Sequence, residues 1–554
     1  MERNQKINNR KKNNDLNVLT FPVQLPLNKI QDDFSILLNG YNDRYRDEII
    51  SKAFKYHSKG NISEAIKYYK YFIDKGFIDA RVFANYGIIL NDLGKIQEAE
   101  KHTRQAIKLN PKFVNAYYNL GIILKNLRKY NEAEYFTRIA IQLNPNFSDA
   151  YNNLGSILID LGKRKEARES IEKSLSLNPK LAEAYNNLAS ILIDLGELNK
   201  AKKLIHKSID IKPDLTRAYF SLSMLPYSNE NSIWKDHLFS ETILHNKSLK
   251  DKSDIYFARA NILHNEQKYK LSSINLDLAN KISSKLLPSN VELLLTKSKK
   301  LLRVIEGVAP IEVINTKSNQ SIFIVGMPRC GSTLLESILT MNSKVDDLGE
   351  VNIFEESYLE SGFKGEIKEK KKLNQLYFTK IRELSKSPYI TTNKMLYNYQ
   401  YAGMIAMGIS NCKIIHCFRN PLDNILSIYR AHFTKGNEYS SSLFDIARVY
   451  LDHQDVMSHY KNRFRSKIFD LNYDLLVKEP AIQIKKLISW LSWKWNDHYL
   501  SPHLNDRVVL TASSVQVRSP INPKSVGGWK NYSQMLEPAI KVLRKDKNFK
   551  NTNA

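Results

Sequence analysis

Small residues and prolines recur every 34 residues through the first part of this chain, and this period restricts the fold more than any other feature. The recurring positions are Pro111, Pro145, Pro179 and Pro213; Gly87, Gly121, Gly155 and Ala189; and Ala65, Ala99, Ala133, Ala167 and Ala201. Each unit of this length predicts two helices whose small residues allow a close crossing, and each proline ends the second helix. One helix pair cannot bury its apolar face alone, so consecutive units must stack into a solenoid.

This period is typical of tetratricopeptide repeats. We predict about five repeats over residues 44–214, preceded by a flexible basic leader over residues 1–43. The period is lost after residue 214, and residues 215–315 are predicted to be degenerate helical pairs that connect the repeats to a second domain. A capping role is expected there, because the end of a solenoid must be closed off from water.

A column of asparagines shares the same period. Its members are Asn85, Asn119, Asn153 and Asn187. Amides aligned in this way can hydrogen-bond an extended peptide without reading its sequence. The column resembles the asparagine ladder in the tetratricopeptide arm of O-linked N-acetylglucosamine transferase, which implies that these residues bind a protein or peptide acceptor. The alternative is that they cap or decorate a solvated groove in an asparagine-rich chain.

A second signal begins at Ile322, where a short apolar run predicts a buried strand that leads into Gly326. The loop that follows ends at Gly331, and Ser332 begins a predicted helix. Backbone N–H groups and the helix dipole then point to one spot and form an anion site. The glycine spacing is that of a nucleotide-phosphate loop, but Ser332 stands where that loop has its lysine, and Arg329 lies inside the loop.

This loop resembles the 5′-phosphosulfate loop of sulfotransferases that use 3′-phosphoadenosine 5′-phosphosulfate (PAPS). The resemblance implies that the 5′ end of PAPS is held without a metal by Arg329, Cys330, Gly331, Ser332 and Thr333. An arginine suits a sulfuryl or phosphate group that needs no metal. The alternative is an ordinary strand, turn and helix in an α/β core.

Another strand–turn–helix pattern covers residues 413–429 and resembles the 3′-phosphate segment of the same enzymes. Arg419 follows its strand and Ser427 lies on its helix. An arginine can grip a phosphate dianion through two hydrogen bonds, and a serine hydroxyl can add a third. The two motifs occur in the order that the resemblance requires, about 90 residues apart, so each strengthens the other.

Two residues between these motifs match catalytic positions of the family. Glu350 occupies the place of the base in enzymes that sulfate protein tyrosine, and Lys394 the place of a lysine near the bridging oxygen of the leaving phosphate. A base would remove the acceptor's proton, and a lysine would stabilise the developing charge. The alternatives are a carboxylate at a helix N-terminus and a surface lysine. Other candidate bases are His416, His432 and His503.

The C-terminal segment resembles the part of the family that closes over PAPS. Ser513 matches a catalytic serine, and the candidate phosphate contacts are Arg518, Lys524 and Lys530. Gly527 and Gly528 would permit a mobile segment that excludes water from the site. The alternative is a basic, solvated loop.

Composition narrows the remaining classes. The net charge of +26 favours an anionic cosubstrate, but without an arginine-rich aromatic module we expect no nucleic-acid binding. The three cysteines lie outside any CxxC or zinc spacing, which predicts no metal, no disulfide framework and a cytoplasmic protein. Residues 1–14 lack the apolar core of a signal peptide, and we expect no membrane span.

We therefore predict a tetratricopeptide α-solenoid followed by a P-loop-like α/β sulfotransferase domain with a central parallel sheet over residues 316–545, and a polar tail over residues 546–554. The predicted reaction moves a sulfuryl group from PAPS to a hydroxyl and leaves adenosine 3′,5′-bisphosphate. The acceptor stays open between protein tyrosine, a glycan and a small molecule, and so does the oligomeric state. The alternatives are a peptide-binding scaffold with an inactive transferase domain and a nucleotide kinase.

Overall fold

A computed structural model describes residues 34–226, 233–308, 319–385, 389–433, 436–505, 507, 509, 511 and 513–549. Residues 1–33, most of the predicted leader, lie outside these ranges. So do residues 309–318, which cover the end of the predicted connector and the first residues of the predicted sulfotransferase domain, and residues 550–554 of the predicted tail. Helix α1 (Phe34–Ser58) begins inside the stretch predicted as leader. The described chain divides into two compact units, residues 1–191 with 210–212, and residues 192–209 with 213–554.

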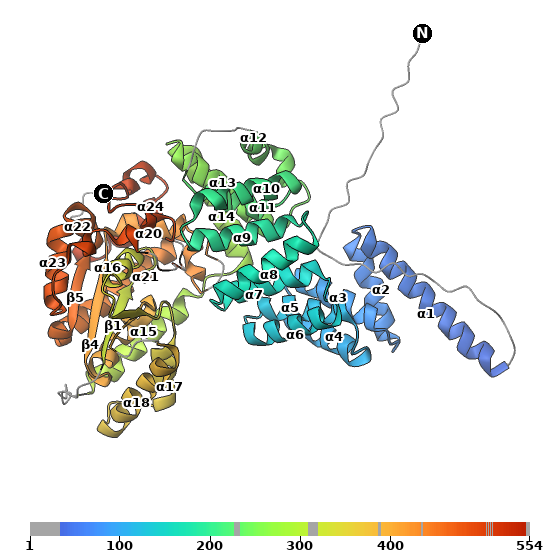
Figure 1. Ribbon diagram of the computed structural model, residues 1–554, viewed down its shortest axis with the longest axis horizontal. Helices are drawn as coiled ribbons and strands as arrows, with labels where there is room; N and C mark the ends of the chain where they lie inside the picture. Colours follow the sequence, from blue (N-terminus) through green and yellow to red (C-terminus); the bar gives the residue numbers. More distant parts are fainter. Residues whose placement is uncertain are drawn as a thin grey trace, which may run out of the picture. The chain divides into compact units, whose positions relative to one another are not determined.

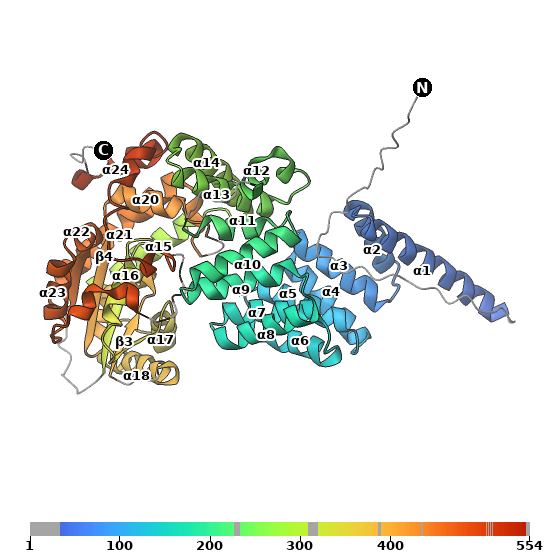
Figure 2. The same cartoon turned by 45° about the horizontal axis from the view of Figure 1, so that its top comes forward.

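The first unit is a row of antiparallel helix pairs, seen side by side in Figure 1 and Figure 2. After α1 its helices are α2 (Ile62–Asp74), α3 (Ala80–Asp92), α4 (Ile96–Leu109), α5 (Val114–Asn126), α6 (Tyr130–Leu143), α7 (Ser148–Asp160) and α8 (Arg164–Leu177), and α9 (Ala182–Asp194) crosses into the second unit. The recurring glycines lie at the helix crossings. A Cβ atom on Gly121 would lie 2.2 Å from Thr137 Oγ1, and one on Gly155 would lie 2.3 Å from Ile171 Cγ1. The solenoid predicted from the 34-residue period is thus confirmed.

We expect Gly121→Ala to destabilise this unit, because the added methyl group must displace Thr137 at a packed crossing. Overpacking of this kind costs about 1–3 kcal/mol. Thermal or urea unfolding would measure the loss, and the double variant with Thr137→Ala should recover part of it. An unfolding midpoint equal to that of the wild type would contradict the close crossing.

The second unit begins with further helices. These are α10 (Leu198–Ile211, most of which lies in this unit), α11 (Thr216–Ser223), α12 (Ile233–Phe239), α13 (Leu249–Asn265), α14 (Tyr269–Leu286) and α15 (Val291–Glu306). Helices α13 and α14 pack closely on one another, as a degenerate pair would. Several of their side chains reach the α/β part of the same unit: Asn280 Nδ2 donates to the Tyr429 carbonyl (3.0 Å), and His432 Nε2 lies 2.7 Å from Asp254 Oδ1.

The α/β part is built on a five-stranded parallel sheet in the order β2-β3-β1-β4-β5. The strands are β1 (Gln320–Gly326), β2 (Val345–Asp347), β3 (Ile390–Asn393), β4 (Cys412–Phe418) and β5 (Ile468–Asn472). The central strand β1 pairs with β3 on one side and with β4 on the other, where Gly326 is in register with Cys417. A parallel sheet is buried on both faces, which explains why β1 and β4 read as apolar runs. The predicted fold class is therefore confirmed.

Alternate residues of β1 pack on opposite faces of this sheet. Phe323 and Val325 join a core with helices that include α15, α18 (Ile367–Leu384), α19 (Ala402–Gly408) and α21 (Leu443–Phe464). Ile322 and Ile324 face α16 (Ser332–Leu339) and α23 (Pro480–Trp490). The remaining helices are α17 (Ile353–Ser361), α20 (Pro421–Tyr429), α22 (Tyr473–Lys478) and α24 (Glu537–Leu543).

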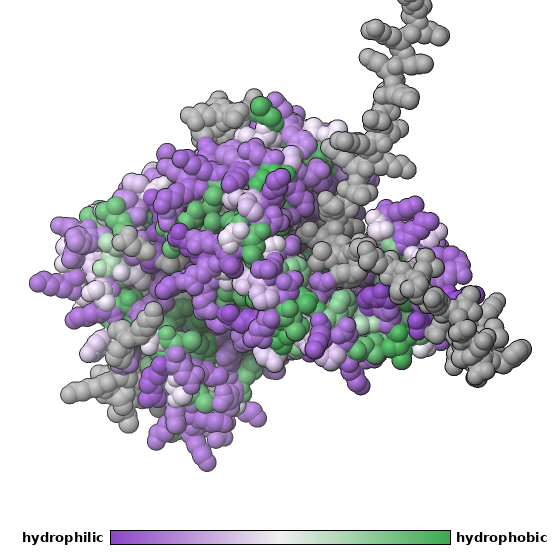
Figure 3. Space-filling view, turned by 45° about the vertical axis from the view of Figure 1, so that its right-hand side comes forward, coloured by the Kyte–Doolittle hydropathy of each residue, from purple (hydrophilic) through white to green (hydrophobic). Residues whose placement is uncertain are grey.

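Hydrophilic side chains cover most of the face drawn in Figure 3, in keeping with the high charge of the chain. Across the described residues, no helix combines the length and the apolar character needed to cross a bilayer.

Candidate active site

All five strands end at one edge of the sheet. Candidate residues follow four of these strands there, and Tyr473, which was not a candidate, follows the fifth. The glycine loop follows β1, Glu350 follows β2, Lys394 follows β3, Arg419 follows β4 and Tyr473 follows β5. The carboxyl ends of parallel strands form the usual binding edge of an open α/β sheet. Residues as far apart in sequence as Gly326 and Tyr473 therefore meet in one region.

The glycine loop folds back sharply between β1 and α16. Arg329 has φ 65°, a left-handed conformation that a residue with a side chain adopts rarely. Gly331, with φ 95°, is the N-cap of α16, and a Cβ atom there would lie 2.1 Å from the Tyr473 ring. Gly331 offers no side-chain acceptor to the first N–H groups of α16, which suits the binding of an anion at this helix end.

Arg329 joins the loop to two other candidate segments. Its Nε donates to Ser427 Oγ (3.2 Å), its Nη1 to Ser513 Oγ, and its Nη2 to Gln516 Oε1 (3.0 Å). Burial, together with the nearby guanidinium groups of Arg419 and Arg430, lowers the pKa of Arg329 to about 10. A cation whose pKa is lowered in this way gains most from an anionic ligand.

Arg419 lies almost fully buried at the same edge. Its guanidinium stacks 4.8 Å from the centre of the Tyr473 ring, and its Nη2 donates to the Ser525 carbonyl. The carboxylates of Asp423 and Asp474 lie at 4.0 and 3.9 Å, the limit of an ion pair, and the buried Nε has no hydrogen-bond partner within the described chain. An unmatched buried donor of this kind fits a phosphate ligand.

Lys394 and Glu350 form a direct ion pair. Lys394 Nζ lies 2.7 Å from Glu350 Oε1, and the lysine is 1% exposed while the Glu350 side chain is 53% exposed. Behind the lysine, Glu336 Oε2 lies 3.8 Å from Lys394 Nζ and accepts a hydrogen bond of 2.9 Å from Arg507 Nη2. The lysine is therefore held from within while the carboxylate of Glu350 stays open to an incoming group.

Comparison with known proteins identifies this part of the chain. Residues 321–497 match a family model described as the sulfotransferase family, and tetratricopeptide repeat models match residues 80–113, 102–135, 148–181 and 170–203. The chain joins tetratricopeptide repeats to a sulfotransferase-family domain. The predicted combination is thus confirmed.

Individual relatives match only parts of the chain. An uncharacterized protein of Aquifex aeolicus (strain VF5) is 32% identical over 267 residues, and the chain spans about a third of that relative's length (44% of this chain and 35% of the relative). A crystal structure of MamA protein is 24% identical, covers 30% of this chain and 92% of its own, and has a TM-score of 0.27. A crystal structure of a tetratricopeptide repeat protein from Parabacteroides merdae is 17% identical. The match covers 45% of this chain and 96% of that protein, with a TM-score of 0.33.

The remaining residues predicted to bind the cosubstrate differ from Arg329 and Arg419 in their burial and contacts. Cys330 is 1% exposed and packs in the core. The Arg518 guanidinium donates to the carbonyl oxygens of Asn505, Arg507 and Asp194, so it fastens the C-terminal segment. Lys524 and Lys530 are exposed. Their phosphate contacts stay predictions.

Two N–H groups of the C-terminal segment are fixed to the sulfotransferase domain by one carboxylate. Asp423, 3% exposed on α20, accepts hydrogen bonds from the Gly527 N–H (2.7 Å) and the Trp529 N–H (2.9 Å). The backbone on both sides of Gly528, in the stretch predicted to be mobile, is therefore hydrogen-bonded to α20.

Two of the three rival histidines, His416 and His432, are engaged in packing, whereas His503 is partly buried and its Nδ1 has no hydrogen-bond partner within the described chain. His416 is fully buried, with Nδ1 3.0 Å from Asp470 Oδ1 and Nε2 3.0 Å from His453 Nε2. His432 pairs with Asp254 and stacks 4.5 Å from Phe257. His416 is therefore a core residue, and its burial lowers the pKa of its imidazole.

The asparagine column lies largely between repeats. Asn85 is fully buried, Asn119 Nδ2 lies 3.5 Å from the Ala84 carbonyl of the preceding repeat, and Asn187 Nδ2 donates to Asn152 Oδ1 (2.9 Å). Asn153 Nδ2 donates to Thr137 Oγ1 (3.3 Å). These amides link helices in this structure, and their role in acceptor binding stays a prediction.

Sequence reasoning missed Glu336, Arg507 and Arg430, which meet the site through contacts between distant segments. A charged residue inside the apolar face of α16 was the one available signal for Glu336.

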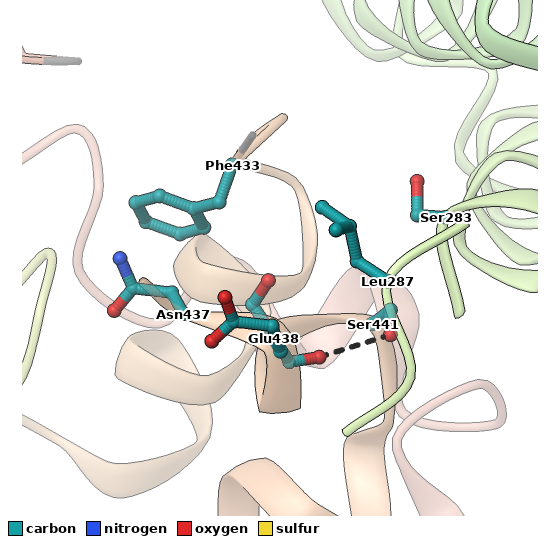
Figure 4. Close-up of a pocket in the computed structure, with 7 residues that line it drawn as sticks. Ser283, Leu287, Phe433, Asn437, Glu438 and Ser441 are labelled. Carbon is teal, nitrogen blue, oxygen red and sulfur yellow. Dashed lines mark hydrogen bonds between the residues drawn. The ribbon is translucent and has the colours of Figure 1, made fainter. Parts of the chain in front are cut away.

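A separate small hollow lies at the end of α14 (Figure 4), lined by Ser283, Leu287, Phe433, Asn437, Glu438, Ser440 and Ser441. Its volume of about 10 Å³ has room for one water molecule.

Proposed function

We propose that this protein is a PAPS-dependent sulfotransferase that transfers a sulfuryl group to a hydroxyl acceptor. The single observation that carries the proposal is the meeting of Arg329, Ser427 and Ser513 in one hydrogen-bonded group. Arg329 and Ser427 lie within the matched sulfotransferase-family region, and Ser513 lies in the segment that follows it. They lie near Arg419 and Arg430, of which Arg419 alone has carboxylates, those of Asp423 and Asp474, at the limit of ion-pair distance among the described residues. A cluster of arginines favours a polyanionic nucleotide.

In this proposal each end of the nucleotide has its own residues. Arg329 and the first turn of α16, with Ser332 and Thr333, hold the 5′ end, and Arg419 and Ser427 hold the 3′-phosphate. PAPS supplies the sulfuryl group, whose bond to the phosphate oxygen breaks as a bond from the acceptor oxygen to sulfur forms. Glu350 accepts the proton of the acceptor hydroxyl.

Lys394 and Ser513 stabilise the negative charge that grows on the leaving phosphate oxygen. Lys394 is already oriented by Glu336, so it does not have to be reorganised during the reaction. The nucleotide product is adenosine 3′,5′-bisphosphate, and the chemistry requires no metal. Among the described residues, no group of three or more acidic, histidine or cysteine side chains is arranged to hold one.

The acceptor hydroxyl is proposed to belong to a protein tyrosine that the repeat arm binds, with a glycan or a small molecule as the alternatives. Tetratricopeptide repeats are general protein-interaction modules, which supports a protein or peptide partner. We also propose a cytoplasmic location, because Cys330, Cys412 and Cys417 are all free thiols, as a reducing compartment favours.

Isothermal calorimetry tests the nucleotide assignment. The wild-type protein should bind adenosine 3′,5′-bisphosphate equally well with magnesium and with a chelator, and more tightly than ATP. A nucleotide kinase would instead prefer ATP with magnesium. A peptide-binding scaffold would bind neither nucleotide, and either outcome would contradict the proposal. Transfer of label from PAPS to a protein fraction, followed by identification of the labelled residue, would then define the acceptor.

A further inference from the structure

Arg430 lies on the same face of α20 as Ser427, one helical turn later. Residues three apart on a helix are neighbours, and Ser427 is the hydroxyl that Arg329 contacts. Arg430 directly follows Tyr429, the last residue of α20. Its side chain therefore borders the group of predicted nucleotide contacts, although neither sequence motif includes it.

A chain of hydrogen bonds fixes the position of Arg430. A guanidinium can only donate, so Arg430 Nη1 donates to His264 Nε2 (3.0 Å) and the proton of a neutral His264 lies on Nδ1. His264 Nδ1 then donates to Tyr532 Oη (2.8 Å), Tyr532 to Ser272 Oγ (3.0 Å), and Ser272 to the Ala260 carbonyl (2.8 Å). Each donor from His264 to Ser272 has an acceptor, and the chain of hydrogen bonds ends on the backbone of α13.

The positive charge of Arg430 is not paired with a carboxylate of any described residue. Among the described residues no carboxylate lies within ion-pair distance of it, and its Nε is shut off from solvent without a hydrogen-bond partner. Arg329 likewise pairs with hydroxyl and amide oxygens and with no described carboxylate. A partly buried cation that is held by a neutral histidine and has an unused, solvent-excluded donor is suited to an anionic ligand.

We propose that Arg430 is a third arginine of the nucleotide site, that it binds the 3′-phosphate together with Arg419 and Ser427, and that His264 is its positioning residue. This inference rests on the proposed function. It assigns a second role to the helix pair α13–α14, since these helices supply His264 and Ser272 to the bonded chain. The end of the helical region is then part of the nucleotide site as well as a connector.

Calorimetry with two ligands tests the inference. Arg430→Ala should weaken binding of adenosine 3′,5′-bisphosphate by about tenfold or more, the usual effect of losing a hydrogen bond to a charged group. It should leave binding of adenosine 5′-monophosphate, which lacks the 3′-phosphate, within about twofold. His264→Ala should reduce binding in the same selective way but less, and His264→Gln should restore part of it, because its amide oxygen can accept from Arg430.

The matched control is Arg382→Ala, which removes an exposed arginine whose hydrogen bonds, within the described part of the chain, go only to its own helix, α18. It should bind both ligands like the wild type. Equal binding of adenosine 3′,5′-bisphosphate by Arg430→Ala and the wild type would overturn the inference, and so would an equal loss for both ligands. If Arg430→Ala does not fold, as judged by its melting curve, loss of the same selectivity in His264→Ala decides the question. A wild-type protein that binds neither ligand would instead refute the proposed function.

Discussion

Arg329→Ala should lower turnover of PAPS by a hundredfold or more. Arg329 donates to Ser427, Ser513 and Gln516, and it is the one cation inside the glycine loop. Loss of a single preorganised donor at developing charge typically raises a barrier by about 2.7–4 kcal/mol. Initial rates with labelled PAPS measure the effect. Folding is checked separately by a melting curve, because the variant also removes the hydrogen bonds of Arg329 to Ser427, Ser513 and Gln516.

Arg329→Lys is the control that separates charge from geometry. Lysine keeps the positive charge but loses the planar pair of donors, so this variant should recover only part of the activity. Full activity of Arg329→Ala would show that Arg329 does not hold the reacting group, and full activity of Arg329→Lys would show that its positive charge is enough without the planar pair of donors.

Glu350→Gln should abolish most of the turnover while leaving nucleotide binding nearly unchanged. The amide keeps the shape of the side chain and a hydrogen bond to Lys394, but it cannot take a proton from the acceptor. General-base catalysis commonly contributes about 10²- to 10⁴-fold in rate, and the loss should fall in that range. Steady-state rates and calorimetry on the same preparation provide the two measurements.

Glu356→Gln provides the comparison for Glu350, since Glu356 is an acidic side chain on α17 that pairs only with Lys380 among the described residues. It should retain the wild-type rate. If Glu350→Gln also turned over at that rate, the base would have to be sought elsewhere, and His432→Ala would be the next variant to assay.

The parts of this molecule that repeat or follow a local pattern were predictable from the sequence. The 34-residue period defines helix pairs because Gly121 and Gly155 must lie at crossings, and the apolar run before Gly326 defines a strand because nothing polar interrupts it. The order of motifs predicted the parallel sheet. The resemblance indicated catalytic roles for Lys394 and Glu350, but their place at the edge of the sheet and their ion pair are visible only in the structure.

Contacts between distant segments escaped the sequence. Nothing near Arg518 indicates that its guanidinium meets three backbone carbonyls, and nothing near Arg430 points to His264, some 166 positions earlier. The asparagines at 34-residue spacing look equivalent, yet Asn85 is fully buried and Asn153 is only partly so. Such differences arise from three-dimensional packing, which a one-dimensional period does not encode.

The two fixed points of the C-terminal segment have a consequence for how fast the enzyme can begin a new cycle. Arg518 fastens one end through three carbonyls, and Asp423 fastens the other through the Gly527 and Trp529 N–H groups. Hydrogen bonds to charged groups are worth about 1.5–3 kcal/mol each, so both ends resist displacement. Between these points Ser525 is held as well, because its carbonyl accepts a hydrogen bond from Arg419 Nη2. If the proposed nucleotide binds at this edge, we expect its release to depend on how easily the short stretch from residue 519 to residue 524 can move.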